Sequence, residues 1–340
     1  MADLPPQSVL EHIVDVHCHP TDAPSISPTS MEQLKITICA MSTMESDQHL
    51  VRALALAYPS KVVPCFGYHP WFTHRISLHN PLHATSKDDH YRSLFLGHSS
   101  VSAADHIAIY EKLAPELPVP VSLAHVLSEL RRNLEAFPGA MLGEVGLDRV
   151  FRVPFDYHAA RRQLTPFTVP LEHQLAVLEA QLDIAVELGR NISMHGVKSQ
   201  AATLALLARM KAKHGGKWSR INIDLHSCGL SPETWRDIEV RVPLSIGVAV
   251  FQGVLGRKST QTCFCRLLVE SDFNDVDRCT ERTWEMIKIV AEVKGWPLET
   301  KWVEDLPEKD WGTVRRLEKN WLAFKSDVKV AALNPQTGTQ

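Results

Sequence analysis

Histidine and carboxylate side chains recur where apolar, β-rich runs of this sequence end. Asp15, His17 and His19 occupy alternate positions of one such run, and alternate residues of a strand point to the same face. Two imidazoles in this arrangement can converge on one divalent cation, although a pair of histidines on a strand is often structural. Five of the seven other runs end in further residues of the same types, namely His69, Glu144, Asp148, His195, His226, Glu270 and Asp272.

The recurrence of these residue types predicts a metal site. Burial alone explains it poorly, because an unpaired buried charge costs several kcal/mol. The six main candidates have no matching Lys or Arg and suit Zn or Mn better than Mg. Six ligands exceed what one catalytic ion needs, so we expect two divalent ions that share a carboxylate. The six are His17, His19, Glu144, His195, His226 and Asp272.

The elements that position these residues alternate between strand and helix. Segments with helical periodicity separate most of the apolar runs, and this order predicts parallel strands joined by right-handed crossovers. Eight such units favour an α/β fold of the (β/α)8 TIM-barrel type over residues 1–328, with a doubly wound open sheet as the competing architecture. A barrel would bring the strand ends to one face. The runs are 12–19, 35–42, 61–70, 139–148, 191–196, 221–227, 243–251 and 266–272.

Two regions lie outside this alternation. Residues 71–120 are rich in His, Asp and Ser, and we expect either a lid over the barrel face or an inert surface insertion. The histidines of this segment are expected at the surface. Residues 311–328 have an amphipathic pattern that predicts a C-terminal helix packed on the barrel, and the polar residues 329–340 are expected to be disordered.

Composition limits the function classes. A formal charge of −3 argues against an open basic groove for nucleic acid, although bound cations would add positive charge. The seven cysteines include no C-x-x-C pair, which favours reduced thiols. No signal peptide or membrane-spanning run is visible, so we expect a protein of the cytoplasm, the nucleus or both, with no membrane partner.

Six motifs, taken in order, resemble the TatD-related deoxyribonucleases of the metal-dependent amidohydrolase superfamily. The resemblance covers about residues 12–295, and the combination is far more specific than any single motif. It implies a (β/α)8 fold, a divalent-metal site and hydrolysis of DNA phosphodiester bonds, typically from strand ends. The motifs are DVHCHP (15–20), GYHP (67–70), GEVGLD (143–148), MHG (194–196), DLHS (224–227) and ESD (270–272).

The resemblance also implies a role for each residue. His17, His19 and Asp272 would bind one ion, His195 and His226 the second, and Glu144 would bridge them. His69 would lie beside the scissile phosphate. Asp148 and Glu270 would support the ligands from behind. Apart from the resemblance, we expect Asp15 or Glu270 to fix imidazole tautomers and Asp272 to orient the water as a general base.

Departures from the family pattern concern groups that would hold the substrate. Val197 stands where the family often has Arg, and residues 227–230 also differ, which indicates a divergent, fungal branch. We therefore expect a DNA hydrolase that acts on strand ends or single strands with Mg, Mn or Zn. Two alternatives stay open, a hydrolase of a small amide, ester or lactone, and a barrel kept as a scaffold for a protein partner.

Overall fold

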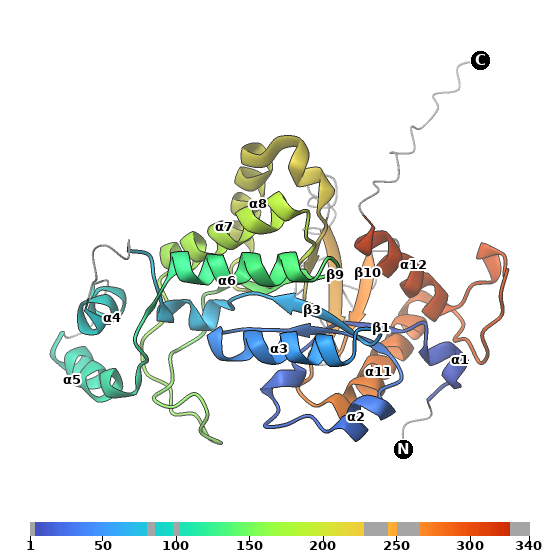
Figure 1. The fold of residues 1–340 in the computed structure, drawn as a ribbon, viewed down its shortest axis with the longest axis horizontal. Coiled ribbons are helices and arrows are strands. Elements are labelled where there is room, and N and C mark those ends of the chain that lie inside the picture. Colours follow the sequence, from blue (N-terminus) through green and yellow to red (C-terminus); the bar gives the residue numbers. More distant parts are fainter. Residues whose placement is uncertain (1–3, 80–85, 98–102, 228–243, 250–265, 327–340) are drawn as a thin grey trace, which may run out of the picture.

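Eight parallel strands form the sheet at the centre of the molecule (Figure 1). Each of the eight predicted runs overlaps one of these strands, and the predicted TIM-barrel fold is confirmed. The structure, a computed structural model, describes residues 4–79, 86–97, 103–227, 244–249 and 266–326. In sheet order the strands are β1 (Val14–Cys18), β2 (Thr37–Met41), β3 (Val62–Phe66), β6 (Met141–Asp148), β7 (Ile192–Val197), β8 (Ile223–Leu225), β9 (Leu244–Ala249) and β10 (Leu267–Glu270).

The first and last strands close the sheet. β1 and β10 lie side by side, and their carboxyl ends exchange backbone hydrogen bonds. The Asp272 N–H donates to the His17 carbonyl at 2.9 Å, and the His19 N–H donates to the Phe273 carbonyl at 2.8 Å. Two predicted site segments are therefore joined directly through their backbones.

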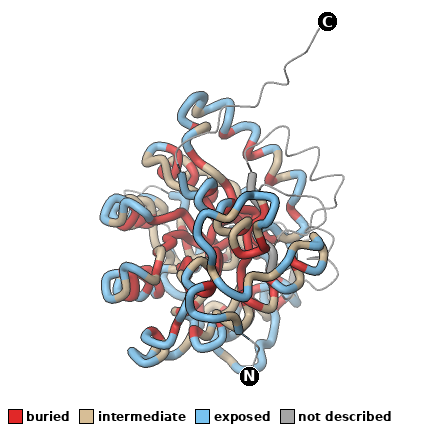
Figure 2. The backbone as a smooth tube through the Cα atoms, turned by 90° about the vertical axis from the view of Figure 1, so that its right-hand side faces the viewer, coloured by how far each residue is buried: buried red, intermediate tan, exposed pale blue. Residues whose placement is uncertain are grey.

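Helices surround the strands and cover their outer face (Figure 1). The helix α7 (Leu171–Leu188) is followed by Gly189, whose φ of +64° is a left-handed conformation that glycine adopts without strain. Figure 2 shows buried backbone in the interior and exposed backbone along the outer helices and loops. The barrel helices are α1 (Gln7–Leu10), α2 (Pro28–Gln33), α3 (Glu45–Ala57), α6 (Leu123–Ala136), α7 (Leu171–Leu188), α8 (Gln200–His214) and α11 (Val276–Lys294), with 3-10 turns η1 (Pro20–Asp22), η4 (Gly215–Arg220) and η6 (Glu308–Asp310).

The predicted C-terminal helix, α12 (Thr313–Lys325), packs against the strands. Its buried Trp321 and Phe324 form a cluster with apolar side chains of β1, β2, β3, β6 and β10. Asn191 and Asn222, which precede β7 and β8, both donate side-chain hydrogen bonds to the Phe324 carbonyl. Because these residues lie at the starts of strands, α12 covers the end of the barrel opposite the strand carboxyl ends.

The segment 71–120 contains more regular structure than its weak periodicity predicts. Two of its helices lie together at the end of the molecule away from α12 (Figure 1). Tyr91, Phe95 and Tyr110 form a buried cluster with Val153 and Phe167 of the loop after β6. The elements of this region are η2 (Pro70–Arg75), β4 (Ile76–Ser77), α4 (Lys87–Phe95), α5 (Ala103–Leu113), η3 (Ala114–Glu116) and β5 (Val121–Ser122), where β4 and β5 pair in parallel.

The prediction that the histidines of this segment lie at the surface was wrong for two of them. His74 and His90 are buried, with 2% and 3% of their surface exposed. Nδ1 of His74 lies 2.8 Å from the Trp71 carbonyl, and Nε2 of His90 lies 2.8 Å from the His74 carbonyl. Carbonyl partners thus satisfy the imidazoles inside the protein. The predicted disordered tail 329–340 lies outside the described residues.

Candidate metal centre

Backbone hydrogen bonds between neighbouring strand ends bring the predicted site residues together. The His69 N–H donates to the Thr43 carbonyl, and the Glu144 N–H donates to the Ser42 carbonyl. The His226 N–H donates to the Met194 carbonyl in the same way. Each site residue is therefore placed by the strand beside it, at the carboxyl ends where active sites of this fold lie.

Glu144 lies at the centre of the cluster, and its two carboxylate oxygens face different imidazoles. Oε2 lies 3.4 Å from His17 Nε2 and 3.2 Å from His19 Nε2. Oε1 lies 2.9 Å from His195 Nδ1 and 3.0 Å from His226 Nε2. Two ligands of one ion with bonds of ~2.0–2.1 Å would lie about 3.0–3.4 Å apart, so these separations fit shared coordination.

Asp272 completes the side of the cluster that contains His17 and His19. Its Oδ1 lies 3.5 Å from His19 Nε2 and 3.9 Å from His17 Nε2. Its side chain is 29% exposed, whereas that of Glu144 is 4% exposed. Asp272 has a φ of 50°, an uncommon conformation for a residue other than glycine that is frequent at functional sites. Asp272 therefore lies on the solvent side of the cluster.

Polar groups lie beside the outer nitrogens of three imidazoles. The contacts of His17 and His195 are hydrogen bonds, whereas that of His226 with the Glu270 carboxylate does not have hydrogen-bond geometry. His17 Nδ1 lies 2.8 Å from Ser193 Oγ, and His226 Nδ1 lies 3.3 Å from Glu270 Oε1. His195 Nε2 lies 3.4 Å from Asp148 Oδ2. If each of these nitrogens carries the proton, the inner nitrogen of each ring presents a lone pair to the space around Glu144.

Ser193 was not identified from the sequence, although a signal for it existed. It lies two residues before His195 on β7, and alternate residues of a strand share a face. Trp71 was also missed. Its indole Nε1–H donates to Asp148 Oδ2 at 2.7 Å, and Asp148 Oδ1 accepts the N–H groups of Val150 and Phe151. Asp148 thus caps the following turn and also contacts a site imidazole.

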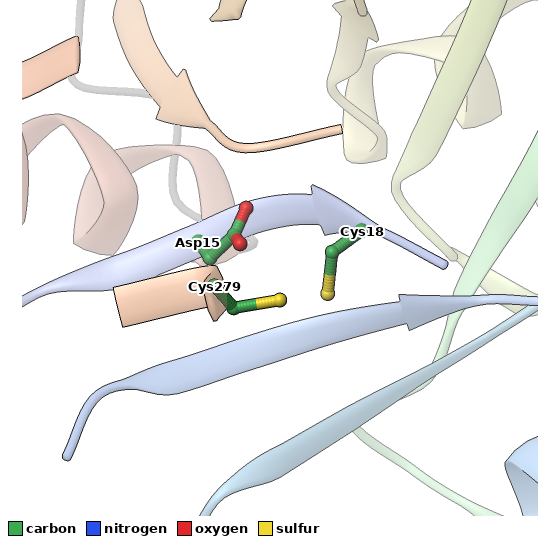
Figure 3. A group of neighbouring side chains, drawn as sticks. All are labelled: Asp15, Cys18 and Cys279. Atoms are coloured by element: carbon green, nitrogen blue, oxygen red, sulfur yellow. The ribbon is translucent and has the colours of Figure 1, made fainter. Parts of the chain in front are cut away.

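Asp15 differs from its predicted role of fixing an imidazole tautomer. Its Oδ1 accepts the backbone N–H of Ser271 at 2.9 Å and lies 3.4 Å from that of His17. Asp15 therefore joins β1 to β10 and acts on the ligands through the backbone. Its carboxyl also lies near the sulfurs of Cys18 and Cys279 (Figure 3), and burial raises the pKa of Asp15 to about 7.

His69 lies on the Oε1 side of Glu144, with its Nε2 3.3 Å away. Its Nδ1 accepts the Trp71 N–H at 3.2 Å, so the ring proton of neutral His69 is on Nε2. Burial lowers the pKa of His69 to about 4. A neutral imidazole with its N–H directed into the cluster is a hydrogen-bond donor there and lacks a free lone pair for a metal.

The electrostatics of the cluster favour positive charge beside Glu144. Burial by itself raises the pKa of Glu144, but the neighbouring His69, His226 and His17 outweigh it and hold that pKa well below its usual range. Burial by itself lowers the pKa of His19 and of His226, but the neighbouring carboxylates outweigh it and raise both pKa values well above the usual range. Among the described residues no Lys or Arg forms a salt bridge with Glu144 or Asp272. Divalent cations would supply that positive charge.

Glycine at position 146 allows β6 and β7 to approach closely. Gly146 has a φ of +152°, and a Cβ added there would lie 2.1 Å from the His195 carbonyl oxygen. These two strands carry Glu144 and His195, whose side chains meet at 2.9 Å. The glycine therefore sets the strand spacing on which that contact depends.

Fold and site together define a class of protein. Imidazoles and carboxylates converge at the carboxyl-end face of a (β/α)8 barrel, with several sets of ligand atoms close enough to hold an ion. This combination is that of a metal-dependent barrel hydrolase.

The comparisons with known proteins give the family. The family model of TatD related DNase matches residues 14–303, and the chain belongs to that family. Among curated proteins, the Cut9-interacting protein scn1 of Schizosaccharomyces pombe is 31% identical over 335 residues, covering 85% of this chain and 95% of the relative. An uncharacterized deoxyribonuclease of Saccharomyces cerevisiae is 27% identical, covering 56% of this chain and 58% of the relative. Both relatives are yeast proteins, in agreement with the expected fungal branch.

Solved structures agree with the fold. YJJV, a TatD homologue of Escherichia coli, is similar with a TM-score of 0.57 and 18% identity over 94% of this chain and 100% of that one. A TatD-family hydrolase of Entamoeba histolytica has a TM-score of 0.57 and 13% identity, covering 92% of this chain and 98% of that one. The expected family and the expected class, a metal-dependent hydrolase of TatD type, are thus confirmed. Among the described residues no helix is long and apolar enough to cross a membrane.

Proposed function

We propose that this protein hydrolyses phosphodiester bonds of DNA, at strand ends or in single strands, with two divalent ions bound around Glu144. The observation that carries the proposal is that the two oxygens of the Glu144 carboxylate face different imidazoles at ligand separations. Oε2 faces His17 and His19, and Oε1 faces His195 and His226 with His69 beside them. A bridging carboxylate between two ions requires this arrangement.

The remaining contacts support a specific division of ligands. His17 and His19, with Asp272, would hold the first ion, and His195 and His226 would hold the second. The outer nitrogens that face Ser193, Glu270 and Asp148 leave inner lone pairs for coordination. This donor set fits Zn or Mn better than Mg, whose sites contain mainly oxygen ligands.

The protein's own groups have separate tasks in hydrolysis. When bound, divalent ions would bind the phosphate oxygens and lower the pKa of a water molecule. His69 would donate its Nε2–H to a phosphate oxygen. Burial alone would raise the pKa of Asp272, but the hydrogen bond from His19 and the charges of His226 and His17 bring it to about 2, so this carboxylate is ionised at neutral pH. Its Oδ2 could accept a proton from the attacking water.

Family membership and one relative's name support DNA as the substrate. The matching model is that of TatD related DNase, and the S. cerevisiae relative is named a deoxyribonuclease. Cys18, Cys39, Cys65 and Cys279 are free and buried, which suits the proposed location in the cytoplasm or nucleus.

The direct test is cleavage of end-labelled single-stranded DNA with and without added Mn²⁺ or Mg²⁺. We expect metal-dependent shortening of the strand by the wild type and a loss of at least 100-fold in Asp272→Asn. Asp277→Asn is the matched control, because Asp277 is an exposed carboxylate five residues further along the chain. Equal cleavage by Asp272→Asn and the wild type would refute the assigned role of Asp272.

Two other functions have distinct signatures. A small amide, ester or lactone substrate would appear as hydrolysis of nitrophenyl esters in preference to a nitrophenyl phosphodiester. A scaffold role is suggested by the S. pombe relative, which is named for an interaction with another protein. Absence of bound divalent metal on elemental analysis, together with no activity after reconstitution, would favour the scaffold.

A further inference from the structure

A row of alternating guanidinium groups and aromatic rings adjoins the metal centre. The Arg75 guanidinium lies 5.0 Å from the Phe72 ring centroid, and the Phe72 and Tyr157 centroids are 4.8 Å apart. The Arg162 guanidinium lies 4.1 Å from the Tyr157 centroid. We call Arg75, Phe72, Tyr157 and Arg162 the arginine–aromatic ladder. Its two middle rings pack edge to face, and its two ends are cationic.

The ladder adjoins the proposed catalytic residues at two points. The Phe72 ring centroid is 6.4 Å from that of His69. Arg162 and His19 both interact electrostatically with Asp22, which also interacts with Glu144 and Asp272. The ladder therefore flanks the metal centre on the side of His69.

Neither guanidinium group forms a salt bridge with a carboxylate of the described residues, and the interaction of Arg162 with Asp22 acts at longer range. Among the described residues the buried Nε of Arg75 has no hydrogen-bond partner, and Nη1 of Arg75 lies 3.8 Å from Met44 Sδ. An unpaired, partly buried guanidinium is costly, and an anion beside it would remove that cost.

A cavity gives a ligand access to Arg75. It has a volume of about 230 Å³, and Phe72, Tyr68 and Ile76 form part of its mostly apolar wall. Drug-sized ligand sites have volumes of ~300–1,000 Å³, so this cavity suits a smaller group such as one base or nucleotide. The charged residues among those that line this cavity are Arg75, which is basic, and Glu45, which is acidic.

The loop that supplies Arg162 is locally basic and held in a fixed shape. Residues 149–170 contain four arginines and one aspartate, a net charge of +3 in a chain whose formal charge is −3. The Phe155 N–H donates to the Gln163 carbonyl at 3.0 Å, and an antiparallel bridge joins Pro154 to Leu164. Nε of Arg162 donates to the Tyr157 carbonyl at 2.9 Å, which fixes the guanidinium over the ring. Such preorganisation lowers the entropic cost of binding.

We propose that the arginine–aromatic ladder binds the single strand of DNA next to the metal centre, with Arg162 and Arg75 contacting two of its phosphates. This inference rests on the proposed function, because it takes DNA as the substrate. The buried Phe72 and the half-buried Tyr157 space and orient the two guanidinium groups. Planar guanidinium groups pair with phosphate oxygens in bidentate fashion.

The test measures binding and catalysis separately. Arg162→Ala and Arg75→Met remove one charge each, and the methionine preserves packing over Phe72. Arg209→Ala is the matched control, because Arg209 is an exposed arginine on α8 paired with Glu179. Binding of a fluorescein-labelled single-stranded oligothymidylate is followed by anisotropy in EDTA over a range of salt concentrations. Cleavage of the same strand in Mn²⁺ gives kcat and KM.

Each ladder variant should bind the oligothymidylate about five- to ten-fold more weakly than Arg209→Ala. Its slope of log K against log salt should be smaller by about 0.7, the value for one lost contact to a phosphate of a single strand. The loss in cleavage should appear mainly in KM, and kcat/KM for bis(p-nitrophenyl) phosphate should fall at least five-fold less than that for DNA.

Ladder variants that match Arg209→Ala in affinity and slope would overturn the proposal, and so would a wild type that does not bind the strand. If the wild type binds DNA but cleaves neither substrate, the proposed function fails, while the binding comparison still decides the ladder.

Discussion

Glu144 is the residue on which the geometry of the site converges. Glu144→Gln preserves the shape of the side chain but removes the negative charge that the five imidazoles around it share. We expect a fall of at least 100-fold in Mn²⁺ affinity, measured by isothermal titration calorimetry, and a matching loss of DNA cleavage. Unchanged Mn²⁺ binding in this variant would place the metal site elsewhere.

A substitution of Asp148 tests whether its contact with His195 supports that proposed metal ligand. In Asp148→Asn, Oδ1 can still accept the N–H groups of Val150 and Phe151, but the amide nitrogen cannot accept from Trp71 and His195. Partners behind a metal ligand typically contribute 10- to 100-fold in affinity or activity, and we expect a loss in that range for Mn²⁺ binding. Trp71→Phe is the control, because it removes the indole hydrogen bond but keeps an aromatic ring and the Asp148 carboxylate, and it should lose less. An equal loss in both variants would show that the contact to His195 is unimportant.

The sequence predicted which residues gather at the metal centre but not the groups to which each of them forms hydrogen bonds. Alternation along a strand identified His17 and His19, and the same rule applied to β7 would have found Ser193. It could not show that Asp15 binds backbone N–H groups, since that contact depends on how β1 lies against β10. His74 was misplaced because its carbonyl partner comes from a 3-10 turn that the sequence pattern does not reveal.

At the scale of elements, the spacing of β6 and β7 controls the site. Gly146→Ala would place a methyl group 2.1 Å from the His195 carbonyl oxygen, in a backbone conformation that alanine adopts only with strain. We expect a loss of about 3 kcal/mol or more in the free energy of unfolding, measured by urea denaturation, together with weaker Mn²⁺ binding. A Cβ at Gly139 would meet nothing within 4 Å, so Gly139→Ala is the control. Similar behaviour of the two variants would contradict the role of Gly146.

Strands were predictable because their apolar runs are short and bounded, and α7 and α12 because their periodicity is clear. The pairing of β4 with β5 could not be predicted, since it joins two-residue segments 45 positions apart along the chain. The helices α4 and α5 were also missed. Their buried faces are completed by Val153 and Phe167, so the amphipathic pattern is visible only once the loop after β6 is in place.

The whole molecule should lose stability in mild acid, and His74 contributes to that loss. Burial lowers the pKa of His74 to about 3, whereas the unfolded chain titrates near 6.5. Between these values the unfolded state binds a proton that the folded state does not, so stability falls as pH decreases through that window, by up to about 1.4 kcal/mol per pH unit. His74→Gln should reduce the slope of unfolding free energy between pH 6.5 and 5. His79→Gln, at an exposed histidine of the same segment, should leave the slope as in the wild type.

Metal binding should stabilise the closed barrel as a whole. The proposed ligands lie in or directly after β1, β6, β7, β8 and β10, and the ends of β1 and β10 are joined through His17 and Asp272. Ions that bind only the folded state stabilise it by about 2.7 kcal/mol at 100 times their Kd. We therefore expect Mn²⁺ at that concentration to raise the free energy of unfolding by about this amount over the EDTA-treated protein, as measured by urea denaturation. The free energy of unfolding of Glu144→Gln should change little at the same Mn²⁺ concentration, because the neutral amide is a weaker ligand than the carboxylate that both ions would share. A response in this variant equal to that of the wild type would mean that the stabilising ions bind away from the strand ends.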